Sequence, residues 1–430
     1  MTLSIRSGGV LAATLAATLA VGACGKSDSD SSSGSGAGTT STAAGNTDPA
    51  SVKTGPGVTA KKITLGVMTD LSGAFAPLTS VITHGNEEYW KERNAAGGVC
   101  GRTVDLQIKD HGYDTQKAVV QYRGLAPDVA ALQQLVGSPM TAAILPQLKS
   151  DRMLSIPASW PSELLDDDII ILSGATYELE QINGLGHLMD EGEIKSGDKI
   201  GALYFEGDYG EAGLKGVKYF AEQNDMTVVE QKIQPTDEDM TGQVAAFKRA
   251  GVKVLAVTTA PTQMASLAGI AAAQGLDVPF LGNNPTFDPA VLKSPAAKAI
   301  IANGYFMGPV PPISSSNAKV QKSIKSYKKA FPKDTPKNAA LVGFAEGKIM
   351  YTVLDKACEN GDLSRDGIVK AARQLSAVST SGLAAGDLDF SQLGEPPTRG
   401  AFIARAANIE GGLKQVGGVL ESDLAKEYEG

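Results

Sequence analysis

The stretch that decides the fold is residues 63–102, ITLGVMTDLSGAFAPLTSVITHGNEEYWKERNAAGGVCGR. It opens with an apolar run, Ile63–Met68, which predicts a strand buried on both faces. The segment DLSG at residues 70–73 interrupts this run, and a helical pattern then continues to Arg93. A second strand is predicted at Thr103–Lys109, which completes a βαβ unit. Open α/β sheets bind ligands at the loops that follow such strands, so we expect residues 70–73 to border a binding site.

Strands and helices continue to alternate along most of the chain, which predicts parallel sheets with right-handed crossovers. The alternation falls into two groups that meet near residue 184, and this indicates two similar α/β lobes. Further strands are expected at Ala131–Gly137, Met153–Pro157, Ile169–Leu172, Lys199–Phe205, Thr227–Gln231, Val254–Thr259 and Pro279–Leu281. Further helices are expected at Thr115–Leu125, Ala142–Arg152, Tyr209–Asn224, Met240–Ala250, Pro261–Gln274, Ala318–Ala330, Asn338–Cys358 and Ser364–Leu375.

The composition and the motifs argue against several functional classes. The 430 residues carry a net charge of −8, which argues against a nucleic-acid partner. None of the three histidines lies in an H-x-x-x-H pair, and neither a G-x-S-x-G motif nor a P-loop occurs. The glycine-rich segment Gly207–Gly213 lacks the dinucleotide-binding spacing. We therefore expect a binding protein rather than an enzyme, with no cofactor and no metal.

The N-terminus predicts export. Arg6 precedes an apolar segment, Val10–Val21, and small residues lead to Cys24, so residues 1–23 are expected to be a signal peptide. A cysteine at this place resembles a bacterial lipobox, in which Cys24 would be lipidated; the alternative is an ordinary cleavage site beside an incidental cysteine. Residues 24–60 are rich in Ser, Gly, Thr and Ala and predict a flexible, lipid-anchored tether. No later apolar stretch reaches the roughly 20 residues that span a bilayer.

Cys100 and Cys358 are the cysteines that remain after Cys24. In an exported protein two such residues favour a disulfide over a metal site, because two ligands do not complete a zinc shell. We therefore expect a bond between Cys100 and Cys358.

Several short motifs resemble the branched-chain amino acid (Leu/Ile/Val) receptors of ABC importers, which have the type I periplasmic binding protein fold. The resemblance covers most of the chain from about Lys61 onward. It is carried by Ser72-Gly73 and Gly85, by residues 94–99 before Gly101-Arg102, and by residues 110–118, Tyr209-Gly210 and residues 275–282.

This resemblance implies two Rossmann-like lobes joined by a three-segment hinge, with a ligand cleft between them. Lobe 1 is expected at residues 61–181 and 312–400, and lobe 2 at residues 182–311 and 401–430. It also implies an extracytoplasmic monomer that captures an amino acid or a related small molecule and delivers it to an ABC permease in the membrane. Two alternatives remain on the sequence alone: a sensory receptor on the same scaffold, and an exported hydrolase.

The resemblance also implies ligand-binding residues. Two loops after strands would hold the polar end of the ligand, although ordinary helix capping also explains their hydroxyl groups. Lobe 1 would supply apolar walls, and lobe 2 would close the other side, with Phe287 either near the rim or in the core. The expected set is Phe75, Leu78, Ser138, Thr141, Ala158, Ser159, Trp160, Tyr209, Gln263 and Asn284.

Two of these positions depart from the amino acid receptors. The family places a carboxylate on lobe 2 to meet the ammonium group of the ligand, and our alignment puts Gln263 there. Trp160 stands where the family has a threonine that contacts the polar end of the amino acid. Both changes favour a less cationic and flatter ligand than leucine, such as an amide, a carboxylic acid or an aromatic compound. The alternative is an alignment shifted by one or two residues, with Trp160 only a buried wall.

Overall fold

The computed structural model describes residues 51–430. The predicted signal peptide, Cys24 and most of the predicted tether therefore lie outside the described residues. Within residues 51–430, no helix is long and apolar enough to cross a membrane.

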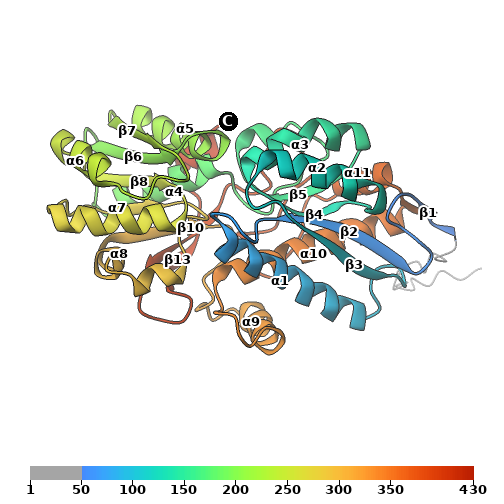
Figure 1. Cartoon of the computed structure of the whole chain (residues 1–430). Coiled ribbons are helices and arrows are strands. Elements are labelled where there is room, and N and C mark those ends of the chain that lie inside the picture. Colours follow the sequence, from blue (N-terminus) through green and yellow to red (C-terminus); the bar gives the residue numbers. More distant parts are fainter. Residues whose placement is uncertain (1–50) are drawn as a thin grey trace, which may run out of the picture. The chain divides into compact units, whose positions relative to one another are not determined.

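Lobe 1 is built on a four-stranded sheet in which every pairing is parallel, in the order β3-β2-β4-β5. Helices α1 and α10 pack together on one face of this sheet, and α2 and α3 lie on the other (Figure 1). The strands are β2 (Lys62–Thr69), β3 (Thr103–Asp110), β4 (Leu132–Val136) and β5 (Ser155–Ala158). The helices are α1 (Ala76–Ala95), α2 (Thr115–Leu125), α3 (Ser138–Asp151), α9 (Ala318–Ala330), α10 (Asn338–Glu359) and α11 (Arg365–Ala372).

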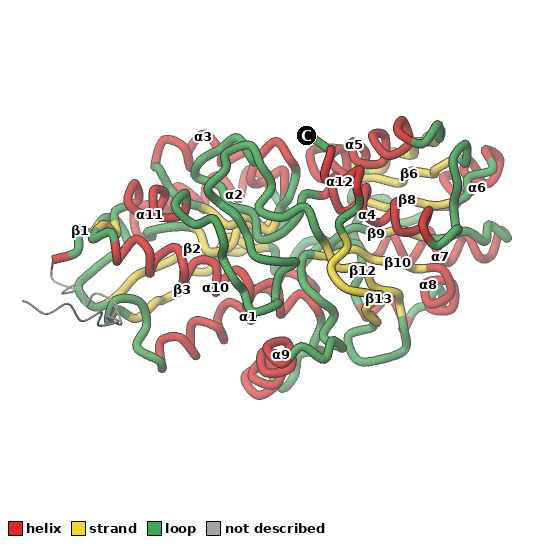
Figure 2. The backbone as a smooth tube through the Cα atoms, turned by 180° about the vertical axis from the view of Figure 1, so that it is seen from behind, coloured by secondary structure: helices red, strands yellow, loops and turns green. Residues whose placement is uncertain are grey.

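Lobe 2 is built on a seven-stranded sheet in the order β13-β12-β10-β9-β8-β6-β7. Its pairings are parallel except those of β12, which runs antiparallel to both β10 and β13 at one edge (Figure 2). The strands are β6 (Lys199–Phe205), β7 (Thr227–Ile233), β8 (Val254–Thr258), β9 (Phe280–Gly282), β10 (Gly304–Gly308), β12 (Ala401–Ala406) and β13 (Leu413–Leu420). The helices are α4 (Tyr177–Asp190), α5 (Asp208–Gln223), α6 (Thr241–Ala250), α7 (Pro261–Gln274), α8 (Ala297–Asn303) and α12 (Asp423–Glu427).

The predicted α/β class with two lobes is confirmed, and β2 is buried along all but its first residue. The chain passes between the lobes before α4, after β10 and again before β12. The first passage lies earlier than the predicted boundary at residue 181, because α4 packs on α5 and α12 of lobe 2. Residues 169–172, predicted as a strand, form only one isolated bridge, between Ile170 and Ser155.

The predicted tether is wrong at its carboxyl end. Strand β1 (Lys53–Thr54) pairs with β11 (Asp362–Leu363), and Val52 and Val58 are buried in the core of lobe 1. The Ser- and Gly-rich composition of this segment predicted a flexible chain throughout. The two valines nevertheless attach residues 52–58 to the lobe, because their apolar side chains are buried.

Helices α1 and α10 approach so closely that glycine is required where they cross. A Cβ atom on Gly85 would lie 2.3 Å from the Ala340 carbonyl oxygen, and one on Gly343 would lie 2.1 Å from the Ile82 carbonyl oxygen. A disulfide joins Cys100, in the turn after α1, to Cys358 at the end of α10, with Cα atoms 6.4 Å apart. The predicted bond is thus present in the structure and links the two ends of this helix pair.

Candidate functional site

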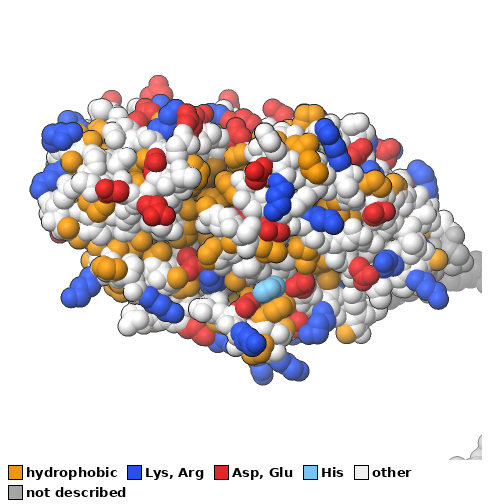
Figure 3. Space-filling view, viewed as in Figure 1, with side chains coloured by type: hydrophobic (Ala, Val, Ile, Leu, Met, Phe, Trp, Pro, Cys, Tyr) orange, Lys and Arg blue, Asp and Glu red, His pale blue; other side chains and the backbone are white. Residues whose placement is uncertain are grey.

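A pocket lies between the two lobes, at the carboxyl ends of the parallel strands. It holds about 910 Å³ of space not occupied by protein atoms, counting the part open to solvent. Figure 3 shows hydrophobic side chains gathered in the hollow between the lobes. Such a concave, mostly apolar site between lobes is where α/β proteins of this kind bind small molecules.

Asp70 positions the loop between β2 and α1. Its carboxylate accepts hydrogen bonds from the backbone N–H groups of Ser72 (3.2 Å), Gly73 (2.5 Å) and Phe75 (2.9 Å). Asp70 itself is fully buried. The interruption after the first strand is therefore a rigid turn, which holds the Phe75 ring against the pocket.

An aromatic wall covers one end of the pocket. The Phe75 ring lies 4.9 Å from Tyr113 and 6.1 Å from Tyr209, centroid to centroid, and Tyr209 lies 4.9 Å from Tyr177. Trp160 packs edge-on against Tyr177 at 5.8 Å. Burial raises the pKa of Tyr177 and of Tyr209 well above the ordinary value, so both phenols stay neutral. This end of the pocket offers rings and hydroxyl groups but no charge.

The amino terminus of α3 contributes Ser138 to the pocket. The hydroxyl of Ser159 donates to the Ser138 hydroxyl at 2.8 Å, and the Thr141 hydroxyl donates to the Gly137 carbonyl at 3.0 Å. Both donors are fully buried and do not line the pocket. Ser159 and Thr141 therefore hold the loop, while Ser138 faces the cavity.

Lobe 2 presents two amides after β9. The Asn283 oxygen accepts a hydrogen bond from the Thr286 hydroxyl at 2.9 Å and lies 3.1 Å from the Tyr209 hydroxyl. Its amide nitrogen is buried and has no partner among the described residues. The Asn284 backbone N–H donates to the Glu180 carboxylate at 2.9 Å, and burial raises the pKa of Glu180 well above its ordinary value.

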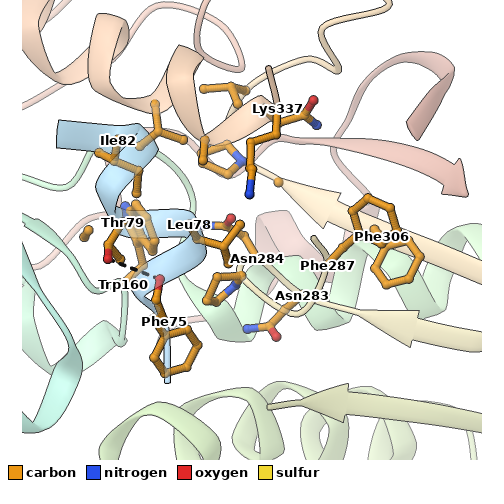
Figure 4. Close-up of a pocket in the computed structure, with 18 of the residues that line it drawn as sticks. Phe75, Leu78, Thr79, Ile82, Trp160, Asn283, Asn284, Phe287, Phe306 and Lys337 are labelled. Atoms are coloured by element: carbon orange, nitrogen blue, oxygen red, sulfur yellow. Dashed lines mark hydrogen bonds between the residues drawn. The ribbon is translucent and has the colours of Figure 1, made fainter. Parts of the chain in front are cut away.

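Lys337 is the one charged residue that lines the pocket within the described chain. It immediately precedes α10, and its side chain extends toward Leu78 (Figure 4). The ammonium group donates to the Asp288 carboxylate at 2.5 Å and to the Pro77 carbonyl at 2.9 Å. Asp288 belongs to lobe 2 and the other two residues to lobe 1, so this buried ion pair joins the lobes.

Seven of the ten sequence-predicted residues line the pocket, while Thr141, Ser159 and Gln263 do not. Gln263 instead donates from its amide to the carbonyl groups of Pro235 and Asp237, each at 3.0 Å. It therefore holds the loop after β7 and does not line the pocket. The side-chain amides that lobe 2 presents to the pocket are those of Asn283 and Asn284, which are also neutral. The seven that line the pocket are Phe75, Leu78, Ser138, Ala158, Trp160, Tyr209 and Asn284.

Sequence reasoning missed several pocket residues, among them Tyr113, Tyr177, Phe306 and Lys337. Tyr113 follows β3, and its position after a parallel strand was a usable signal. Lys337 precedes the long helix α10 and could have been noticed as a cation at a helix start, where cations are unfavourable. Phe287 lines the pocket and also packs on Phe306, with ring centroids 4.7 Å apart.

The two-lobed fold and the pocket between the lobes define a substrate-binding protein. The chain belongs to the periplasmic binding protein family, whose model matches residues 62–412. It is thus an extracytoplasmic substrate-binding protein of the ABC transporter type. No curated protein matches the chain.

Solved structures of this type resemble it over nearly their whole length. A fatty acid ABC transporter substrate-binding protein from Thermomonospora curvata is 41% identical, with a TM-score of 0.85, and the match covers 88% of this chain and 97% of that one. A branched-chain amino acid ABC transporter protein from Thermus thermophilus with bound valine is 19% identical, with a TM-score of 0.74, covering 87% and 99%. A leucine binding protein from Thermotoga maritima is 15% identical, with a TM-score of 0.71, covering 84% and 99%. The last two likenesses concern the fold.

Proposed function

We propose that this protein captures an apolar carboxylic acid, such as a fatty acid, and presents it to an ABC permease. One observation carries the proposal: the pocket is walled by aliphatic and aromatic side chains, and Lys337 is its single charged residue in the described chain. Burial of an alkyl chain there is favourable by about 0.8 kcal/mol for each methylene group.

The same pocket is unsuited to a free amino acid. An amino acid brings an ammonium group, and burying that charge without a partner costs several kcal/mol. No carboxylate lines the pocket among the described residues. Asp288 and Glu180, the nearby buried acids, are engaged by Lys337 and by the Asn284 backbone N–H.

The similarity to the Thermomonospora curvata fatty acid protein supports the same ligand class, because the match spans almost all of that chain. Capture would follow the usual scheme for two-lobed receptors. A ligand bound to one lobe gains contacts with the other and shifts the open–closed equilibrium toward the closed form.

The ligand class is tested by thermal shift and isothermal titration. We expect octanoic, decanoic or palmitic acid to raise the melting temperature and to bind in the micromolar range or tighter, because a ligand that binds only the folded state stabilises it. Leucine, isoleucine and valine should leave the melting temperature unchanged. Tight binding of any of these amino acids, with no response to the fatty acids, would refute the proposal.

We further propose that Cys24 is lipidated and anchors the protein at the outer face of the membrane, where it can meet its permease. The support is the sequence Val21-Gly22-Ala23-Cys24 after an apolar segment. Cys24→Ala should release the protein into the medium or leave it unprocessed in cell fractionation. Membrane retention of a normally cleaved variant would contradict the anchor.

A further inference from the structure

We propose that Lys337 binds the carboxylate of the ligand, and that the apolar tail extends toward the aromatic wall. This inference rests on the proposed function and specifies the orientation of the ligand. It places the charged end opposite to the loops of Ser138 and Ala158, which the resemblance to amino acid receptors implies for that role.

The first support is the environment of the ammonium group. The Lys337 side chain is 11% exposed and lines the pocket, so its charge acts in a partly dehydrated site. An ammonium group has three N–H donors. Two of them are used by Asp288 and by the Pro77 carbonyl, which leaves one for a ligand at the pocket wall.

The second support is the start of α10. Lys337 is the N-cap residue of this 22-residue helix, and Asn338 and Ala339 line the pocket next to it. The Ala340 backbone N–H donates to the Lys337 carbonyl at 3.0 Å, the N–H groups before it have no preceding helical turn to bind, and the helix dipole is positive there. Lys337 and the start of α10 therefore form an anion-binding end of the pocket.

Asp288 does not remove this capacity. Its second carboxylate oxygen accepts a hydrogen bond from the Ala290 backbone N–H at 2.8 Å, so Asp288 has a hydrogen-bond donor besides Lys337. One ammonium group together with the helix terminus can then bridge Asp288 and a ligand carboxylate. Because Asp288 lies on lobe 2, the bridge would also tie ligand binding to the contact between the lobes.

The third support is the opposite end of the pocket, which suits an alkyl tail. In Figure 4, Lys337 lies on one side of the pocket, and Phe75 and Asn283 lie on the other. The polar atoms of the loops there are uncharged: the Ser138 hydroxyl accepts from Ser159 and keeps its own O–H as a donor, and the Trp160 indole N–H donates to the Ser173 hydroxyl at 3.3 Å. This end of the pocket therefore presents ring surface together with two uncharged donors, the Ser138 hydroxyl and the Asn283 amide, and no cation.

The test compares an acid with uncharged ligands of the same chain length: decanoic acid, 1-decanol and methyl decanoate. The wild type should bind decanoate about tenfold to a hundredfold more tightly than decanol, as expected for a hydrogen bond to a charged group. The variant K337M/D288N removes both charges together and avoids leaving one buried charge unpaired. It should bind all three ligands alike, whereas K337R should keep the preference for the acid.

Two controls accompany the test. K322M, which changes an exposed lysine on α9, should behave as wild type, and thermal unfolding of each variant establishes that it is folded. A folded double variant that keeps the preference for decanoate overturns the inference. Equal weakening of acid and alcohol also overturns it, because that result assigns Lys337 a role in lobe closure only. Failure of the wild type to bind any fatty acid refutes the proposed function as well, which separates the two failures.

Discussion

Glu346 offers a quantitative test of the electrostatics of lobe 1. It lies on α10, its side chain is fully buried, and one carboxylate oxygen accepts a hydrogen bond from the Asn86 amide at 2.9 Å. The other oxygen has no partner among the described residues. Burial raises the pKa of Glu346 from 4.5 to about 8, so the folded protein holds this side chain protonated at neutral pH.

This pKa shift makes stability fall as the pH rises. Below pH 4.5 both the folded and the unfolded chain are protonated at Glu346, and the group has no effect on the free energy of unfolding. Between 4.5 and about 8 only the unfolded chain ionises, which favours unfolding. At pH 7 this interval spans 2.5 pH units, and each unit is worth about 1.4 kcal/mol, so the destabilisation reaches about 3 kcal/mol.

The variant E346Q keeps the size of the side chain and stays neutral in both states. We expect it to match the wild type near pH 4 and to exceed it in free energy of unfolding by about 3 kcal/mol at pH 7, measured by urea denaturation across that range. E359Q changes an exposed glutamate on the same helix, 61% accessible, and should shift stability by less than about 0.5 kcal/mol at any pH. A difference between E346Q and the wild type that does not change with pH would refute the reasoning.

Two further predictions concern the packing of lobe 1. Gly343→Ala should lower the free energy of unfolding by about 2 kcal/mol or more, because the new methyl group would lie 2.1 Å from the Ile82 carbonyl oxygen. Gly242→Ala on α6, where a Cβ meets nothing within 4 Å, should instead stabilise by up to about 1 kcal/mol, and a similar loss in both variants would contradict the packing argument. The double variant C100A/C358A removes a disulfide between residues 258 positions apart. Its free energy of unfolding, measured by urea denaturation, should fall by up to about 5 kcal/mol. A free-thiol count of two at Cys100 and Cys358 in the unreduced denatured protein would refute the bond.

Local sequence patterns were sufficient for the α/β class and for most helices and strands, while the three-segment connection of the lobes was implied by the family resemblance. The apolar run at the start of residues 63–102 became the buried strand β2, and the interruption at Asp70 became the turn that presents Phe75 to the pocket. Both follow from physics that acts over a few residues: a strand buried on both faces must be apolar throughout, and a short polar side chain can satisfy the backbone of a turn. Gly85 was recognised from a short sequence motif. Glycine is required there because α1 contacts α10 at this position, which only the tertiary structure shows.

The ligand-facing chemistry was decided by the tertiary structure. Gln263 had a suitable side chain in a suitable helix, yet its contacts with Pro235 and Asp237 turn it to a loop of its own lobe. The local signal of Lys337, a cation at a helix start, did not indicate its contacts, because folding brings it to Pro77, 260 residues earlier, and to Asp288, 49 residues earlier. Periodicity records which face of an element is buried, whereas the partner that a buried polar group meets depends on how the chain passes between the lobes.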